Sequence, residues 1–211
     1  MFKKITRGKL ERFLAPHATD KRVLDIGSGG SSYDRFFPNR LTADIDPQRG
    51  PTVIADVQHM PFQDGEFEVV LCTEVLEHVQ NPFLAVSELE RVLCPGGVLL
   101  LSTRFIYPIH DAPSDYFRYT KYGLRHLFQN WDIQELMEET SGFETLAVLL
   151  QRVNFRTKLR LNAVLKLLIF LTAAILRRFN FLIVKEFGDI KKSREEQHIF
   201  ASGYYLVARK K

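Results

Sequence analysis

Short apolar runs alternate with helical patterns over the first 138 residues, and this alternation limits the fold more than any other feature. Strands that alternate with helices are typical of βαβ units, in which the strands lie parallel in one sheet. The pattern therefore predicts an α/β fold built on a mostly parallel sheet. The expected strands are Val23–Ile26, Leu41–Ile45, Val53–Ala55, Val69–Cys72, Val98–Thr103, Trp131–Leu136 and, near the end of the chain, Gly203–Lys210.

Helix signals occur between these strands. The clearest helix follows the letters NPFLAVSELERVLCPGG, where Asn81 suits the N-cap, a proline occupies the first turn, and the C-P-G-G run at 94–97 ends the helix. Thr120 is the expected N-cap of a helix that continues to Phe128. After the first strand, the sequence leaves room only for a short helix over Ser31–Phe37.

The first expected strand leads into a glycine-rich turn, VLDIGSGG, which suits a ligand-binding loop. A nucleoside triphosphate loop needs a Lys-Ser/Thr pair after its glycines, and the letters GSGGSS contain no lysine. The dinucleotide fingerprint G-x-G-x-x-G is met by Gly27 and Gly29, but Ser32 stands in place of the third glycine. The turn alone therefore leaves two interpretations open, a ligand site or a tight turn without a ligand.

Acidic residues at the ends of the next two strands favour the ligand site. Asp44, in the letters ADIDP, lies at about the right distance beyond the glycines to accept hydrogen bonds from a ribose diol. Asp56 lies in the block ADVQHMPF, which follows the third expected strand and precedes the strand FEVVLC.

Five segments, taken in order, resemble the class I S-adenosylmethionine-dependent methyltransferases: VLDIGSGG, ADIDP, ADVQHMPF, FEVVLCTEVLEHV and RVLCPGGVLLLSTR. They cover about residues 23–104. Besides the short helix after the first strand, the chain departs from the family in two places. Glu68 stands where the family usually has Asp, and only DPQRGPT separates strands two and three, which is too short for a crossover helix. The resemblance implies a Rossmann-like, mostly parallel seven-stranded sheet with an antiparallel last strand and helices on both faces.

The resemblance also implies S-adenosyl-L-methionine as the cofactor. Gly27 and Gly29 would let the backbone approach its methionine moiety, and Asp25 would order that loop. Asp44 would hold the ribose hydroxyls, and Asp56 would bind the adenine amino group. The remaining residues of the implied cofactor site are Val57 and Met60, which would flank the ring, together with Ile45 and Thr73.

The segment TEVLEHV carries the candidate residues for chemistry. On a helix, Glu74, Glu77 and His78 would share one side, and with His110 they could bind a divalent ion. The pattern resembles a Glu-x-x-Glu-His element of some metal-dependent methyltransferases. The interpretation that we favour is that these residues order the active-site loop and shape the pocket, without a metal ion. A general-base role for His78 is the third alternative.

The acceptor is expected beyond the fifth strand. The segment from His110 to Phe128 resembles a D-Y-x-R-Y-T-x-x-G-L element that follows strand five in a bacterial methyltransferase subgroup. His110 and Arg118, with His78, are the candidate catalytic residues. Asp115 and Arg118 could instead form an ion pair that fixes the loop.

A helical insertion, residues 141–198, precedes the last strand within one expected domain of residues 1–211. Residues 1–150 hold 15 Lys/Arg against 21 Asp/Glu, whereas residues 151–211 hold 14 against 4. The uninterrupted apolar run Leu167–Leu176 is ten residues, about half of what spanning a bilayer requires. Residues 152–194 could therefore dock on an anionic membrane surface. Packing of the insertion on the sheet or on a second copy is the alternative.

These features predict the transfer of a methyl group to oxygen or nitrogen, with carbon as the third choice, on a small-molecule or lipid-linked acceptor. No nucleic-acid module is visible. Reduced cysteines, Cys72 and Cys94, and a start without an apolar leader run fit a cytoplasmic protein, and docking of the insertion would place it at the inner face of the membrane. Two other functions stay open: a nicotinamide-dependent oxidoreductase, which leaves the Asp56–Phe62 block unexplained, and a membrane-recruited module that keeps the cofactor fold without catalysis.

Overall fold

The computed structural model describes residues 4–30 and 33–211. A seven-stranded sheet forms its centre, with the strand order β3-β2-β1-β4-β5-β7-β6. The pairs β1–β2, β2–β3, β1–β4 and β4–β5 are parallel, and β7 is antiparallel to both of its neighbours, β5 and β6. The strands are β1 (Val23–Ile26), β2 (Arg40–Asp44), β3 (Val53–Ile54), β4 (Phe67–Thr73), β5 (Leu93–Arg104), β6 (Asp132–Glu138) and β7 (Gly203–Arg209). The predicted α/β fold with a reversed last strand is confirmed.

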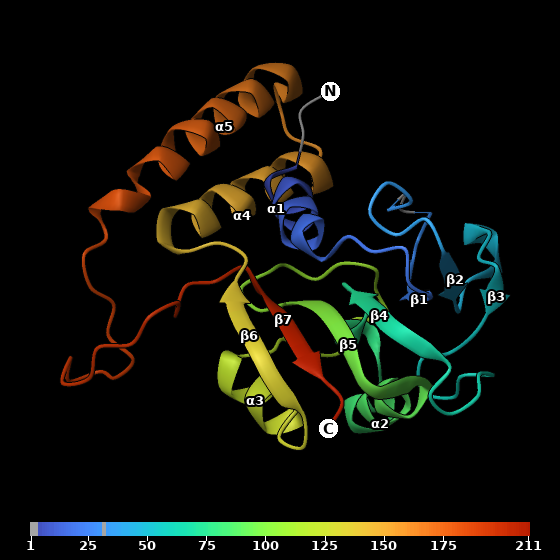
Figure 1. The fold of residues 1–211 in the computed structure, drawn as a ribbon. Coiled ribbons are helices and arrows are strands. Elements are labelled where there is room, and N and C mark those ends of the chain that lie inside the picture. The colour runs from blue at the N-terminus through green and yellow to red at the C-terminus, as the bar shows by residue number, and fades with distance from the viewer. Residues whose placement is uncertain (1–3, 31–32) are drawn as a thin grey trace.

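Helices cover both faces of this sheet (Figure 1). Helices α2 (Pro82–Val92) and α3 (Lys121–Leu127) pack on one face, where Leu89, Val92 and Leu124 belong to the larger hydrophobic cluster. Helix α1 (Ile5–Leu14) packs on the other face and contributes Phe13, whose ring stacks on Tyr205 of β7 with centroids 4.6 Å apart. Both faces of the central strands are therefore buried, as their nearly continuous apolar sequences require.

The predicted caps of α2 and α3 are present. Oδ1 of Asn81 accepts a hydrogen bond from the backbone N–H of Leu84, at 3.2 Å. Oγ1 of Thr120 accepts one from the N–H of Gly123, at 3.0 Å. Each side chain satisfies one of the donors that the first turn of a helix leaves free.

The short helix expected over Ser31–Phe37 does not form in the part of that segment that is described. Ser31 and Ser32 lie outside the described residues. From Tyr33 onward the chain makes a turn, in which the carbonyl of Tyr33 accepts from the N–H groups of both Phe36 and Phe37. Tyr33 and Phe37 are buried against β1 and α1, so core packing replaces the helix here.

The insertion forms α4 (Gly142–Arg156), α5 (Asn162–Leu176) and a 3₁₀ helix, η4 (Arg177–Leu182), followed by an irregular segment that leads to β7. Helix α4 lies beside α1, and α5 lies on the outside of α4 (Figure 1). Short 3₁₀ helices occur elsewhere as η1 (Ala15–His17), η2 (Pro47–Arg49) and η3 (Leu76–His78). In the described part of the chain, no helix combines the length and apolarity that a membrane crossing needs.

Candidate functional site

Two adjoining hollows lie at the carboxyl ends of the parallel strands, which is where open α/β sheets bind ligands. The small cleft has a volume of about 300 Å³, and the large cavity has a volume of about 1160 Å³. Gly27 and His78 line both hollows, so one ligand can extend from the small cleft into the large cavity. Residues that line the small cleft include Asp44, Ile45, Asp56, Val57 and Tyr116; those that line the large cavity include Gly29, Thr73, Glu74, Tyr107, His110 and Arg152.

The glycine turn brings the backbone to the edge of both hollows. Gly27 has φ +67°, in the left-handed region, and a Cβ atom there would lie 2.2 Å from a methyl carbon of Val75. Only glycine fits such a position without a shift of its neighbours. The turn therefore keeps a bare stretch of backbone against the space in which a ligand would lie.

Asp44, at the end of β2, connects the glycine turn to the small cleft. Its side chain is buried, and its two oxygens accept from the N–H groups of Gly29, at 3.1 Å, and Asp46, at 3.0 Å. Each carboxylate oxygen has a second lone pair, so Asp44 can hold the turn and still accept hydroxyl hydrogen bonds from a ligand. Ile45 beside it is 66% exposed, which leaves an apolar surface against which a flat ring can lie.

Asp56 lies across the small cleft from this pair. Its carboxylate accepts from the backbone N–H of Gln58, at 2.9 Å, and from the side-chain amide of the same residue, at 3.3 and 3.2 Å. An exocyclic amine of a ligand can take the place of that side-chain amide. Val57 lines the same cleft.

Two residues of the predicted cofactor set lie away from both hollows. Asp25 is fully buried and pairs with Arg40 of β2, and burial raises its pKa to about 6 although Arg40 opposes the shift. Met60 is buried in the main core, and its backbone N–H donates to Glu88 at 2.8 Å. Asp25 and Met60 are thus placed to support the site from behind.

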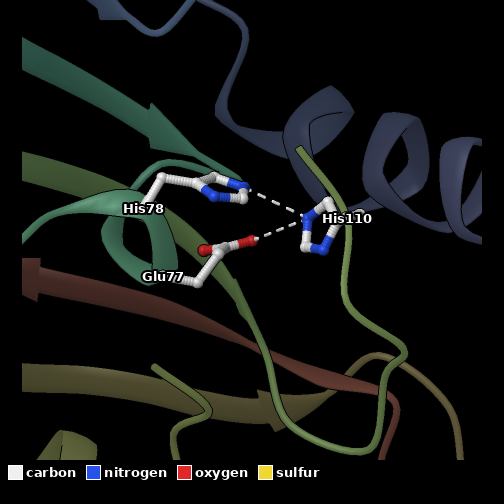
Figure 2. Close-up of side chains that lie close together, drawn as sticks. All are labelled: Glu77, His78 and His110. Carbon is white, nitrogen blue, oxygen red and sulfur yellow. Dashed lines mark hydrogen bonds and ion pairs between the residues drawn. The ribbon is translucent and has the colours of Figure 1, made fainter. Parts of the chain in front are cut away.

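His78 and His110 both line the large cavity, and their rings lie close together (Figure 2). Their Nε2 atoms are 3.1 Å apart, and Nδ1 of His78 lies 2.6 Å from the carbonyl oxygen of Ser114. A carbonyl can only accept, so Nδ1 of His78 carries a proton, and in a neutral imidazole its Nε2 is then the acceptor. Nε2 of His110 then donates to it, which leaves Nδ1 of His110 without a proton in the neutral pair.

The surroundings of His110 control its protonation. Burial and the neighbouring His78 lower its pKa below the usual value of 6.5. Nδ1 of His110 has no hydrogen-bond partner among the described residues, and it lies 3.5 Å from Oδ2 of Asp115. His110 is therefore neutral at pH 7, and a carboxylate is placed beside the atom that would take up a proton.

Glu77 approaches the same pair from below (Figure 2). Its Oε1 lies 3.9 Å from Nε2 of His110 and has no hydrogen-bond partner in the described chain, while Oε2 accepts from Thr103 at 2.8 Å. Burial raises the pKa of Glu77. One ligand atom each from Glu77, His78 and His110 lie within 4.8 Å of one another, a geometry that a divalent ion could use.

Glu74 does not join this group, contrary to the shared helical face that the sequence predicted. Only Leu76–His78 are helical, and Glu74 adopts φ +58°, which turns its side chain elsewhere. Its carboxylate pairs with Arg104 of β5. The predicted Glu74–Glu77–His78 set is therefore replaced by Glu77, His78 and His110, which do come together.

Arg118 fixes the loop that carries His110. It donates to both oxygens of Asp115, at 2.6 and 2.7 Å, and to three backbone carbonyls within residues 107–117. Asp115 in turn accepts from the backbone N–H of His110, at 2.8 Å, and Arg118 lowers its pKa to about 2. Arg118 lines neither hollow, so this geometry favours the loop-fixing interpretation over contact with an acceptor.

Sequence reasoning missed Tyr107 and Arg152, which also line the large cavity. The ring of Tyr107 lies 5.1 Å from that of His110, and the guanidinium of Arg152 lies 4.6 Å from the Tyr107 ring centre. Arg152 belongs to α4 of the insertion, some 40 residues beyond His110. The basic excess of the last third of the chain was the only sequence signal for it.

Comparisons with known proteins agree with this geometry. Residues 24–101 match the family model described as a methyltransferase domain. The chain is 32% identical over 104 residues to the ubiquinone biosynthesis O-methyltransferase of Psychrobacter cryohalolentis, covering 39% of this chain and 40% of that protein. It is 30% identical over 115 residues to the tRNA U34 carboxymethyltransferase of Campylobacter curvus, covering 44% and 38%. The chain thus spans less than half the length of these relatives.

A solved structure extends the likeness to the whole fold. A crystal structure of a putative methyltransferase from Bacillus halodurans has a TM-score of 0.58 with 20% identity, covering 96% of this chain and 97% of that one. The matched region holds the glycine turn, Asp44, Asp56 and His78, and it favours a methyltransferase over a nicotinamide-dependent oxidoreductase. The match over residues 24–101 and the shared fold thus support a class I S-adenosylmethionine-dependent methyltransferase.

Proposed function

We propose that this protein transfers the methyl group of S-adenosylmethionine to an oxygen or nitrogen atom of a small-molecule or lipid-linked acceptor. The observation that carries the proposal is the meeting of the two hollows at Gly27 and His78. A cofactor in the small cleft can present its methyl group at this junction, and an acceptor in the large cavity can approach it from the side of His110.

The residues of the small cleft fit the cofactor. Asp44 offers acceptors for the ribose hydroxyls, Asp56 offers one for the adenine amine, and Ile45 and Val57 offer apolar surface for the ring. When bound, S-adenosylmethionine supplies an electrophilic methyl group on a positively charged sulfur. The chain's main contribution to such a displacement is alignment of the acceptor and exclusion of water.

A hydroxyl acceptor must also lose a proton as its oxygen bonds to the methyl carbon and the carbon–sulfur bond breaks. The His78–His110 pair can take up that proton, because His110 is neutral at pH 7 and Asp115 stabilises the charged pair. Glu77, His78 and His110 would be the ligands if a divalent ion were bound instead, and the ion would then polarise the acceptor oxygen.

A lipid-linked acceptor is favoured by the outer face of α5. Val164, Leu167, Leu168, Leu171 and Ile175 recur at helical spacing and are between 48% and 60% exposed. Lys158 and Arg160 precede the helix, and Arg177 and Arg178 follow it. An apolar face flanked by basic residues fits the interface of an anionic membrane, where a lipid-linked acceptor would be presented.

The test has two stages. The full chain is first titrated with S-adenosylmethionine and, separately, with NADH; saturable binding of the first alone is expected. Labelled S-adenosylmethionine is then incubated with a cell extract that is divided into lipid, small-molecule, protein and RNA fractions. Label in the lipid or small-molecule fraction supports the proposal, and label confined to RNA or protein contradicts it. Cofactor binding without any labelled product would favour the non-catalytic module.

A further inference from the structure

The large cavity is lined by more cations than anions. Its acidic lining residues are already engaged, since Glu74 pairs with Arg104 and Asp111 lies 3.9 Å from Arg156. The cationic residues that line it are Lys4, Arg7, Arg49, Arg152 and Arg156, and the acidic ones are Glu74 and Asp111. Arg7, Arg49 and Arg156 are themselves paired with Glu11, Asp46 and Asp111, so the attraction of the cavity for a negatively charged ligand centres on Arg152.

Arg152 is the cation that most needs such a ligand. It is half-buried, and its guanidinium contacts the Tyr107 ring and donates to Oγ1 of Thr6 in a long bond of 3.4 Å. No carboxylate of the described residues forms an ion pair with it, although Glu74 lies near enough to favour its charge. Burial and the nearby guanidinium of Arg104 lower the pKa of Arg152 to about 10.

Arg104, the neighbour of Arg152, has its charge balanced in a different way. It is buried and pairs with both Glu74 and Glu139, the latter at 2.6 Å. These two carboxylates are thus occupied by Arg104 and are not paired with Arg152. A charge that is withdrawn from water without a partner is costly, and an anion beside Arg152 would offset that cost.

We infer that the acceptor carries a carboxylate or phosphate group that binds Arg152 in the large cavity. This inference rests on the proposed methyl transfer, because it assigns the anion to the acceptor. Arginine presents a planar fork of donors that matches either group in a bidentate manner. The insertion would then supply an acceptor-recognition residue to the site through α4.

The position of Arg152 assigns the anion to the acceptor and not to the methionine carboxylate of the cofactor. Ring contacts lead from Arg152 to Tyr107, at 4.6 Å, and from Tyr107 to His110, at 5.1 Å. Both contacts lie on the side of β5 and the loop after it. The methionine moiety would lie over the glycine turn, which follows β1. A small acceptor can thus contact Arg152 through its anionic group while its nucleophilic atom lies beside His110.

Calorimetric titration of the full chain tests this inference. The protein is first saturated with S-adenosylhomocysteine, and this step alone tests the cofactor site and therefore the proposed function. It is then titrated at fixed ionic strength with inorganic phosphate, with acetate, and with dihexanoyl phosphatidic acid. We expect saturable binding of at least one probe, and at least a tenfold loss of its affinity in Arg152→Gln. Tighter binding of the lipid than of phosphate would identify a lipid-linked source, and the reverse a free one.

Three variants keep the test decisive. Arg125→Gln removes an exposed arginine of α3 on the other face of the sheet and should bind the probes as the unaltered chain does. Arg156 is an exposed residue of the cavity wall and provides a second variant in case Arg152→Gln does not fold. Arg156→Gln should also weaken binding of the probes. The inference is overturned if no probe binds saturably, or if Arg152→Gln and Arg156→Gln bind the probes as tightly as Arg125→Gln does. It is also overturned if Arg152→Gln lowers the affinity for S-adenosylhomocysteine as much as the affinity for the probes.

Discussion

Asp56 allows the cofactor site to be tested without disturbing the fold. Asp44 holds the glycine turn through the N–H groups of Gly29 and Asp46, so its removal would also alter that loop, whereas the described hydrogen bonds of the Asp56 side chain all come from Gln58. We expect Asp56→Ala to weaken S-adenosylmethionine binding by about 1.5–3 kcal/mol, or roughly tenfold to a hundredfold, because a charged hydrogen-bond acceptor is lost. Equilibrium dialysis measures this change. Asp132→Ala, on the exposed surface of β6, is the matched control, and equal affinity in the two variants would place the adenine elsewhere.

His110 is expected to act in turnover and not in cofactor binding. His110→Gln should lower kcat about a hundredfold or more, with little change in the Kd of S-adenosylmethionine, because a positioned base is removed. In the unaltered chain, only the neutral imidazole can accept a proton, and its pKa is lowered. The rate should therefore stay level above pH 6.5 and fall only at more acidic values. His126→Gln on α3 is the control, and equal losses in both variants would remove His110 from the mechanism.

A chelator separates proton uptake from metal binding at the same three residues. If Glu77, His78 and His110 act without a metal ion, turnover in excess EDTA should equal that of untreated protein. Calorimetric titration with Mn²⁺ gives a second readout, and we expect no saturable heat. The opposite result would be loss of turnover in EDTA, restoration of turnover by Mn²⁺, and no restoration in Glu77→Gln. It would show that the cluster holds a metal ion.

How far the sequence could predict this site depends on the kind of residue. Asp44 lies at the end of one β-strand signal and Asp56 directly follows another, so their places at the sheet edge could be predicted. Glu74 could not, because its positive φ arises from the bend between β4 and η3 and no local pattern reveals it. Arg152 could not either, since its approach to Tyr107 depends on how α4 packs beside α1.

The loop between β5 and α3 is the element that positions His110. Arg118→Ala should lower kcat about tenfold while leaving cofactor affinity nearly unchanged, because His110 loses a fixed position; a misplacement of about 1 Å can cost up to a hundredfold. Hydrogen exchange of residues 107–118 should rise in parallel.

Two comparisons show whether Arg118 acts through the loop. Arg118→Lys should restore part of the turnover, because lysine keeps the charge but lacks the planar fork that reaches Asp115 and the carbonyls. If Arg118→Ala loses turnover while loop exchange stays as in the unaltered chain, Arg118 contacts the acceptor directly.

Elements were predicted best where local chemistry and core packing agree. Asn81 and Thr120 cap helices whose apolar faces also meet the sheet, so both signals indicate the same start. The segment after β1 shows the opposite case. The expected helix there competes with the burial of Tyr33 and Phe37. Packing of these two aromatic rings in the core favours a turn of the backbone over a helix. The bounds of β4 and β5 extended beyond the predicted ones because pairing with neighbours continues past the apolar run.

At the scale of the whole molecule, charge and apolar surface are divided between two regions. Residues 1–150 are acidic in balance and contain the residues of the proposed cofactor site, while residues 151–211 are basic and contain α5. Helix α5 packs on α4 through Ala173 and leaves its outer face in solvent. Helix α4 lines part of the large cavity. A membrane bound by α5, which packs on α4, would therefore also lie near the proposed acceptor site.

This arrangement predicts that the full chain binds anionic membranes through α5. It should sediment with vesicles of phosphatidylcholine and phosphatidylglycerol and remain mostly in the supernatant with phosphatidylcholine alone. The double substitution Leu168→Glu and Leu171→Glu should abolish sedimentation, because burying each leucine contributes about 1.5–3 kcal/mol and a carboxylate opposes it. Ile190→Glu, at a fully exposed apolar residue outside α5, should sediment normally. If the unaltered chain stays in the supernatant with both lipids, and size-exclusion chromatography shows a dimer that the double variant loses, α5 instead contacts a second copy.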